Sequence, residues 1–171
     1  MNYGDAIERF HTRRTGALPR GMGMSGFEPG DAGYAERVRA SFARQQVMRT
    51  LGVTVADVQP GEIRLALPYA ATLTQHNGYL HAGVLSTALD SACGYAAYSL
   101  MPADADVLTI EFKVNFLRPA RGEVFAFHGW VVKPGRTISV CEAEVHASSP
   151  TPGPTIATMT ATMIAVFNRE R

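Results

Sequence analysis

The chain has 171 residues, 46% of them hydrophobic, with 18% charged residues and a formal net charge of +1. This length suits one domain with a substantial core, and the near-neutral charge excludes the basic footprint of a nucleic-acid-binding protein. No apolar run is long enough to cross a bilayer, and the first residues lack the basic start and apolar core of a secretory signal. We therefore expect a cytoplasmic protein without nucleic-acid or membrane partners.

The N-terminal part divides into an irregular stretch and a short helix. Residues 1–34 place repeated glycines among Met and Pro, which predicts an irregular N-terminal extension without assigned chemistry. Further on, Val38, Phe42 and Met48 fall close to helical spacing, which predicts an amphipathic helix over 35–50 whose role is packing. The rest of the chain, 35–171, is expected to form a single domain.

Six runs of β-branched or alternating apolar residues predict strands, at 53–58, 62–67, 108–117, 123–133, 137–147 and 155–167. In the third run, one apolar face is expected to lie against a helix, with the polar face outward. The residues of this apolar face are Leu108, Ile110, Phe112, Val114 and Phe116. The fold class that follows is α+β, with an antiparallel sheet of about six strands and no Gly-rich phosphate loop.

A central helix is predicted over 82–101, because this run is rich in Ala, Leu and Ser and contains no proline before Pro102. Its single charge is Asp90. An unpaired carboxylate in such a helix is costly, so Asp90 must meet donors, take up a proton or face a water-filled site. Two interpretations stay open: Asp90 accepts hydrogen bonds from Ser86 or Thr87 one turn back, or it is catalytic.

The start of this helix favours the catalytic interpretation. The first backbone N–H groups, near Ala82 and Gly83, have no partner inside the helix and form an anion-binding end. An ester or thioester carbonyl placed there would have its developing negative charge stabilised. Asp90, about two turns further on, could activate water or attack the carbonyl carbon.

The stretch 75–84, QHNGYLHAGV, followed by LDSA at 89–92, resembles the motif of the hotdog-fold acyl-CoA thioesterases, and among them the phenylacetate-pathway (PaaI-like) branch. The resemblance covers roughly residues 45–168. It implies a hotdog fold, in which the sheet wraps around one central helix. It also implies hydrolysis of an acyl-CoA thioester to a free acid and coenzyme A.

The resemblance implies a role for each matching residue. Gln75 matches the side chain that orients the carbonyl, Ala82 the glycine whose N–H contacts the oxyanion, and Asp90 the catalytic carboxylate. Thr109 matches a Ser or Thr that, in some members, crosses a dimer interface to hold the nucleophilic water. Ala82 departs from the usual glycine: it keeps the N–H, but its methyl group narrows the approach of the acyl chain.

Five other residues are expected to support the site. His81 is expected to orient the loop through ring hydrogen bonds, with general-base catalysis as the alternative. Asn77 and Gly83 are expected to contact the substrate. Arg118 and Arg136 are expected to bind the phosphates of coenzyme A, the alternative being that they are merely solvated.

No metal or separate cofactor is expected, since coenzyme A is part of the substrate. His76 and His81 lie five residues apart in a loop without a further His or Cys nearby, which does not suit metal ligands. Cys93 and Cys141 are interpreted as small core residues. The resemblance implies a homodimer joined edge to edge, or a dimer of such dimers.

Two other functions stay open. One is a non-catalytic acyl-CoA-binding protein on the same fold, and the other is a hydratase or dehydratase acting on acyl thioesters. The acyl group is also open, because Tyr79, Tyr95 and Phe112 with small helix residues allow either a short aromatic or a medium aliphatic group.

Overall fold

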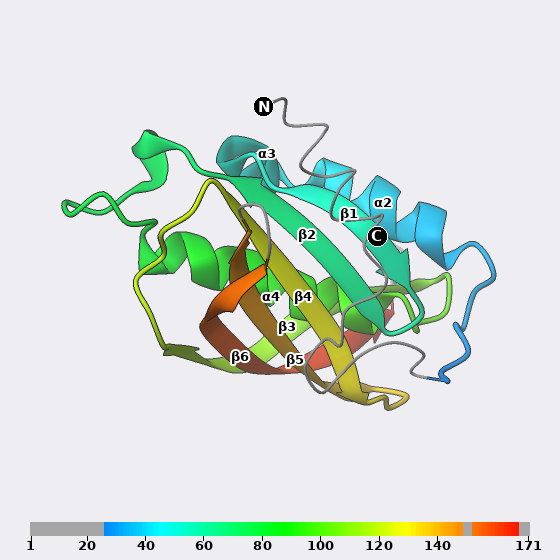
Figure 1. Cartoon of the computed structure of the whole chain (residues 1–171). Helices are drawn as coiled ribbons and strands as arrows, with labels where there is room; N and C mark the ends of the chain where they lie inside the picture. Colours follow the sequence, from blue (N-terminus) through cyan, green and yellow to red (C-terminus); the bar gives the residue numbers. More distant parts are fainter. Residues whose placement is uncertain (1–25, 149–151, 168–171) are drawn as a thin grey trace.

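The computed structural model describes residues 26–148 and 152–167, where one sheet curves around a long helix (Figure 1). The helices are α2 (Tyr34–Arg44), α3 (Gln46–Leu51) and α4 (Ala82–Tyr98), with a 3-10 turn η1 (Ala71–Leu73). The strands are β1 (Thr54–Gln59), β2 (Glu62–Pro68), β3 (Ala105–Phe116), β4 (Val124–Lys133), β5 (Ile138–Ser148) and β6 (Pro152–Phe167). The expected α+β hotdog architecture is confirmed.

The expected N-terminal extension lies mostly outside the described residues, since these begin at residue 26. The division of the chain into an extension and one domain therefore stays a prediction. The helix expected over 35–50 is present as two helices. They meet at Gln45, whose extended backbone (φ −70°, ψ 106°) ends α2 and begins α3.

The sheet has the order β1-β2-β4-β5-β6-β3, and each neighbouring pair is antiparallel. Strand β3 lies at one edge, where it pairs with β6 only. Helix α4 contacts β2, β3, β4, β5 and β6, and so occupies the concave side of the sheet (Figure 1). Helix α2 packs beside β1 and α4.

Small residues let the sheet approach α4 closely. Ala88, Ala92 and Ala96 are fully buried in the helix. At Gly129 of β4, an added Cβ would lie 2.5 Å from the carbonyl oxygen of Ala92, which is closer than any side chain can come. Glycine is therefore required where the backbones of β4 and α4 meet.

Strand β3 contains a bulge that changes which side chains face the helix. Thr109 pairs with Met163 and Glu111 pairs with Thr162, so Ile110 has no partner of its own. Met163 is fully buried, and cross-strand partners point to the same face, so Thr109 lies on the helix side. The prediction that the apolar residues of β3 form one face against the helix is therefore correct after the bulge and wrong before it. Phe112, Val114 and Phe116 share the helix side, whereas Leu108 and Ile110 are 58% and 52% exposed.

Candidate active site

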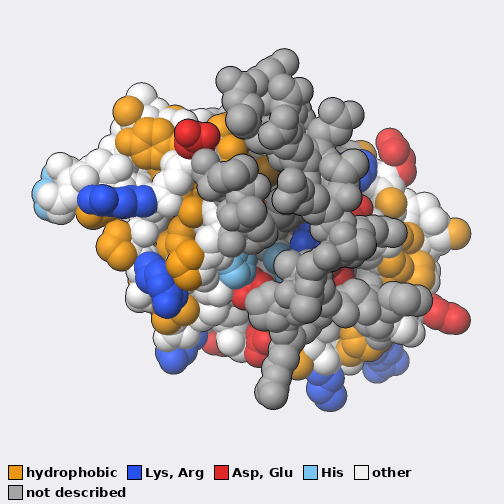
Figure 2. Space-filling model, in the orientation of Figure 1, with side chains coloured by type: hydrophobic (Ala, Val, Ile, Leu, Met, Phe, Trp, Pro, Cys, Tyr) orange, Lys and Arg blue, Asp and Glu red, His pale blue; other side chains and the backbone are white. Residues whose placement is uncertain are grey.

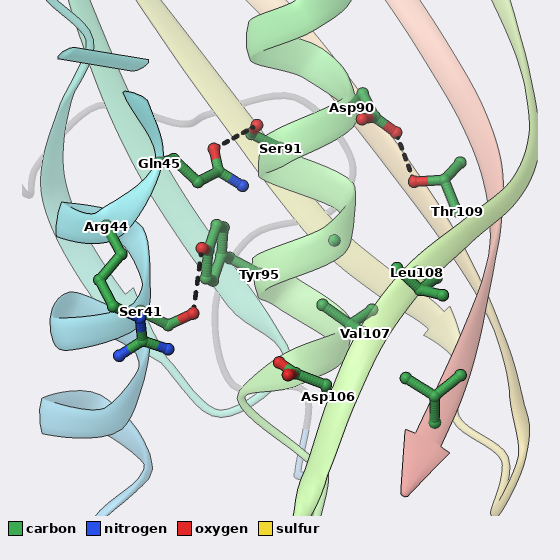
Figure 3. A pocket seen from close by; sticks show the side chains of 12 residues that line it. Ser41, Arg44, Gln45, Asp90, Ser91, Tyr95, Asp106, Val107, Leu108 and Thr109 are labelled. Carbon is green, nitrogen blue, oxygen red and sulfur yellow. Dashed lines mark hydrogen bonds between the residues drawn. The ribbon is translucent and has the colours of Figure 1, made fainter. Parts of the chain in front are cut away.

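Asp90 meets a hydroxyl from the neighbouring strand (Figure 3). Thr109 Oγ1 on β3 donates a hydrogen bond of 2.8 Å to Asp90 Oδ1 on α4. The alternative donors one turn back bond elsewhere: Ser86 Oγ donates to the Ala82 carbonyl at 3.0 Å and Thr87 Oγ1 to the Gly83 carbonyl at 2.8 Å. The interpretation that Asp90 is satisfied by its own helix is therefore wrong.

The surroundings of Asp90 make its carboxylate more basic. Burial raises the pKa of the Asp90 carboxyl above its ordinary value, and the hydrogen bond from Thr109 acts in the opposite direction. The carboxylate is half-buried at the wall of a cavity. A basic carboxylate with access to water is suited to act as a general base.

His81 caps the start of α4. Its ring Nδ1 accepts a hydrogen bond of 2.9 Å from the Gly83 N–H, and the backbone N–H of His81 donates to the Leu73 carbonyl. Nδ1 can accept only while it is unprotonated. The expected role of His81 in orienting the loop through its ring agrees with this geometry, and the contact occupies the Gly83 N–H.

The Ala82 N–H is then the group that α4 offers to a ligand. Ala82 is exposed, and within the described residues no acceptor is found for its N–H. A free N–H at the exposed start of a helix is a donor for an oxyanion.

The loop before α4 orders Gln75. The Gln75 N–H donates to the Tyr79 carbonyl at 2.9 Å, and the Gly78 N–H donates to the Gln75 carbonyl at 3.0 Å. Gly78 has φ +78°, a left-handed conformation that glycine adopts without strain. The Gln75 Oε1 accepts from the Asn77 N–H, which leaves the amide Nε2 for a substrate carbonyl. Asn77 is exposed, and its Nδ2 contacts His76 Nε2 at 3.0 Å.

The arginines near this loop are held in place. Arg121 lies over the Tyr79 ring, 4.7 Å from its centroid, and donates to the Tyr79 hydroxyl at 2.6 Å. Arg118 donates to the Thr155 carbonyl at 2.7 Å. Figure 2 shows Lys and Arg side chains, in blue, at the end of the molecule where the 69–81 loop projects, and others at the opposite end of this face. This end is therefore suited to an anionic group.

Arg136 lies elsewhere. It occupies the turn between β4 and β5, next to the end of β4 where the Val131 N–H bonds the Gly61 carbonyl. The Gly61 N–H in turn bonds Ser99 at the C-terminal end of α4. Because α4 has 17 residues, this end is about 25 Å from Ala82. The structure does not bring Arg136 to the helix start of its own chain.

Ala82 and Asp90 are also separated. They lie eight positions apart on one helix, which corresponds to about 12 Å along its axis. A single thioester carbonyl cannot contact the Ala82 N–H and also receive a water held by Asp90 of the same chain. The residues expected at one site thus form two groups: Ala82 at the helix start, with Gln75 in the loop before it, and Asp90 with Thr109 at the middle of the helix.

A cavity of about 470 Å³ adjoins Asp90, between α2, α4 and the first part of β3 (Figure 3). Helix α2 and its C-cap contribute Ser41, Arg44 and Gln45 to its wall. The expectation that this helix serves packing alone is therefore incomplete. Positions 41, 44 and 45 follow helical i, i+3, i+4 spacing, and this polar stripe was the signal in the sequence.

The two cysteines do not form a second reactive site. Cys93 and Cys141 are buried free thiols, as expected for core residues. Burial raises the pKa of Cys93 well above its ordinary value and that of Cys141 to about 12, so neither is a ready nucleophile. In the described ranges, no three His, Cys, Asp or Glu side chains are grouped to hold a metal ion. None of the helices described here is long and apolar enough to span a membrane.

Comparison with known proteins identifies the family. Residues 77–153 match the family model of the thioesterase superfamily. A protein of Halobacterium salinarum, whose name proposes an esterase, is 39% identical over an alignment of 127 positions, and the match covers 71% of this chain and 82% of that protein. A crystal structure of a thioesterase family protein from Silicibacter pomeroyi is 57% identical and has a TM-score of 0.77, covering 80% of this chain and all of that one. The chain belongs to the thioesterase superfamily.

The thioesterase also shares its fold with PaaI from the phenylacetic acid degradation operon of E. coli. The TM-score is 0.70 at 17% identity, and the match covers 78% of this chain and 93% of that protein. The expected resemblance to hotdog-fold thioesterases is thus confirmed. Membership of the superfamily supports hydrolysis of thioesters as the general reaction class.

Proposed function

We propose that this thioesterase hydrolyses acyl-CoA thioesters to a free acid and coenzyme A. The observation that carries the proposal is the Asp90–Thr109 pair at the cavity wall, at 2.8 Å. A half-buried carboxylate with a raised pKa, fixed by one hydroxyl, keeps its second oxygen for a water molecule. Binding alone does not require a carboxylate in this apolar helix.

In the proposed reaction, Asp90 takes a proton from water while the water oxygen bonds to the thioester carbon. The carbonyl oxygen becomes an oxyanion and accepts a hydrogen bond from an Ala82 N–H, with Gln75 Nε2 as a second donor. The carbon–sulfur bond then breaks, and the proton returns from Asp90 to the coenzyme A thiolate. The products are a free acid and a thiol.

The distance along α4 requires a second copy of the chain in this proposal. The Ala82 N–H and Gln75 of one protomer would serve Asp90 and Thr109 of its partner. The supporting feature is the open edge of β3, where Phe112 and Phe116 are 44% and 46% exposed. Pairing two such edges would continue the sheet across a two-fold axis. Thr109 then belongs with Asp90 of its own chain, rather than with the neighbour's carboxylate as the resemblance implied.

The coenzyme A part of the substrate would lie at the helix start. Arg118 and Arg121 are exposed and lie on the segment between β3 and β4. This segment is bonded to the loop before α4, because the Leu80 N–H donates to the Ala120 carbonyl. A guanidinium fork matches the geometry of phosphate oxygens. Arg136 of the same chain is too distant to share this role.

The test is release of free thiol from a panel of acyl-CoA esters. Asp90→Asn should lower turnover at least about 100-fold, because it removes the base and keeps the shape. Asp104→Asn, an exposed aspartate outside the cavity, is the matched control and should retain activity. An unchanged rate for Asp90→Asn would refute the role of Asp90. Tight binding of acyl-CoA without turnover by the wild-type protein would identify a binding protein instead.

A further inference from the structure

The cavity beside Asp90 has two chemically different ends. Figure 3 shows Asp90 and Thr109 together at one end, with Ser41, Arg44 and Asp106 toward the other. Asp106 and Thr109 are three residues apart on β3, which corresponds to about 10 Å. A thioester carbon placed at Asp90 therefore leaves room for a medium-length acyl chain that ends near Asp106.

The far end offers hydrogen-bonding groups. Ser41 Oγ and the Tyr95 hydroxyl lie 3.3 Å apart there, and Arg44 and Asp106 add charged groups. A plain alkyl chain would remove water from these groups without replacing its hydrogen bonds, which costs free energy.

The charges of the wall argue against an anionic acyl group. Arg44 supplies one positive charge, whereas Asp90 and Asp106 supply two negative ones. Both Arg44 and Asp106 lie in the described part of the chain, and they form no ion pair with each other there. A carboxylate would meet net repulsion, but a hydroxyl can donate to Asp106 and accept from Arg44.

We infer that this cavity selects acyl groups that carry a hydroxyl at the end remote from the thioester, with Arg44 and Asp106 as specificity-determining residues. The inference rests on the proposed function, because it places the acyl part of the substrate in the cavity beside Asp90.

Gly94 sets the width of the cavity. It lines the wall from α4, and an added Cβ would meet no atom within 4 Å. A larger side chain at this position would therefore project into the space that the acyl chain needs. Gly94→Leu should lower kcat/KM for a six-carbon ester much more than for acetyl-CoA, whose acyl group ends before this point.

The experiment compares hexanoyl-CoA with ω-hydroxyhexanoyl-CoA. The wild-type protein should show a kcat/KM roughly 10-fold higher for the hydroxylated ester, the effect of one added hydrogen bond. The double variant Arg44→Met/Asp106→Leu should lose this preference or reverse it. Arg39→Met/Asp104→Leu makes the same chemical changes at exposed positions outside the cavity and should keep the preference.

The outcomes separate this inference from the proposed function. Equal kcat/KM for the two esters in the wild-type protein, or a preference that survives in the double variant, would overturn the inference while leaving hydrolysis intact. If neither ester is turned over, the proposed hydrolysis fails, and calorimetric binding of both esters decides the inference. Tighter binding of the hydroxylated ester that the double variant abolishes supports it, and equal affinities overturn it. If the double variant does not fold, the single variant Arg44→Met, at an exposed position, replaces it in the same comparison of the two esters.

Discussion

Thr109 donates a hydrogen bond of 2.8 Å to Asp90 across the contact between β3 and α4. The Ile110 bulge makes this contact, because a regular strand that keeps Phe112 on the helix side would turn Thr109 outward. A single local irregularity thus decides whether the carboxylate has a partner.

Replacing Thr109 by Val should change the pH dependence of hydrolysis. The hydrogen bond from Thr109 lowers the pKa of Asp90, so its loss raises that pKa further above the ordinary value. The acid limb of the kcat/KM profile should therefore move to higher pH, with turnover reduced about 10-fold at neutral pH. Thr109→Ser keeps the hydroxyl and should keep the wild-type profile. An acid limb that stays in place in Thr109→Val would contradict the pairing.

Asp90→Asn should stabilise the fold at neutral pH. Because burial raises the pKa of Asp90 in the folded state, folding favours the protonated carboxyl. This contribution to stability is present at a pH below the pKa that Asp90 has in the unfolded chain. It is lost as the pH rises through the pKa that Asp90 has in the folded protein. In urea unfolding, the free energy of unfolding of Asp90→Asn should exceed that of the wild type at pH 7, and the difference should shrink toward pH 3. A variant less stable than the wild type at pH 7 would show that the carboxylate is well satisfied.

His81 can be tested as a cap against a role as a base. His81→Ala should cost about 1 kcal/mol of stability, because the Gly83 N–H loses its acceptor. Activity should fall with it, since the helix start that presents Ala82 is loosened. His81→Asn supplies a strong capping side chain but no basic ring, and should restore most of the stability and activity. Failure of Asn to restore activity, with stability restored, would favour general-base catalysis by His81.

The His146–Glu144 pair should add stability within a defined pH window. Its hydrogen bond of 3.1 Å is the main cause that raises the pKa of His146 and lowers that of Glu144. The His146 contribution is lost as the pH rises through its raised pKa, and the Glu144 contribution is lost as the pH falls through its lowered one. His146→Gln should therefore destabilise the protein more at pH 6 than at pH 9 in urea unfolding. An equal effect at both pH values would show that the ion pair contributes nothing.

Gly129→Ala should destabilise the fold by about 1–3 kcal/mol, because its Cβ would collide with the Ala92 backbone. Gly94→Ala is the matched control, since the new methyl group meets open space and alanine suits a helix interior better than glycine. Both are measured by urea unfolding. Equal stabilities of the two variants would mean that β4 and α4 can separate without cost.

The sequence predicted the helix and the sheet because local patterns produce them. The run of small residues before Pro102 predicted α4, which ends at Tyr98 rather than at 101, and alternating apolar residues predicted all six strands. The acid at Asp90 and the helix start at Ala82 followed from the same run, since a single charge in an apolar helix is conspicuous.

The errors concern relations between elements. The bulge at Ile110 was hidden because the period-two pattern continues through it without interruption. The polar stripe of α2 looks like a solvated face until the helix packs beside α4. The separation of Arg136 from Ala82 depends on which end of the sheet each turn occupies, and turn composition does not carry that information.

The unpaired position at Ile110 also bears on how related genes are compared. The interval between the strand hydroxyl of Thr109 and the ring of Phe112 can change by one codon without disturbing the neighbouring ladder, because the extra residue has no pairing of its own. A search pattern with fixed spacing between Thr109 and Phe112 would then miss homologues that keep the same side chains on the helix side.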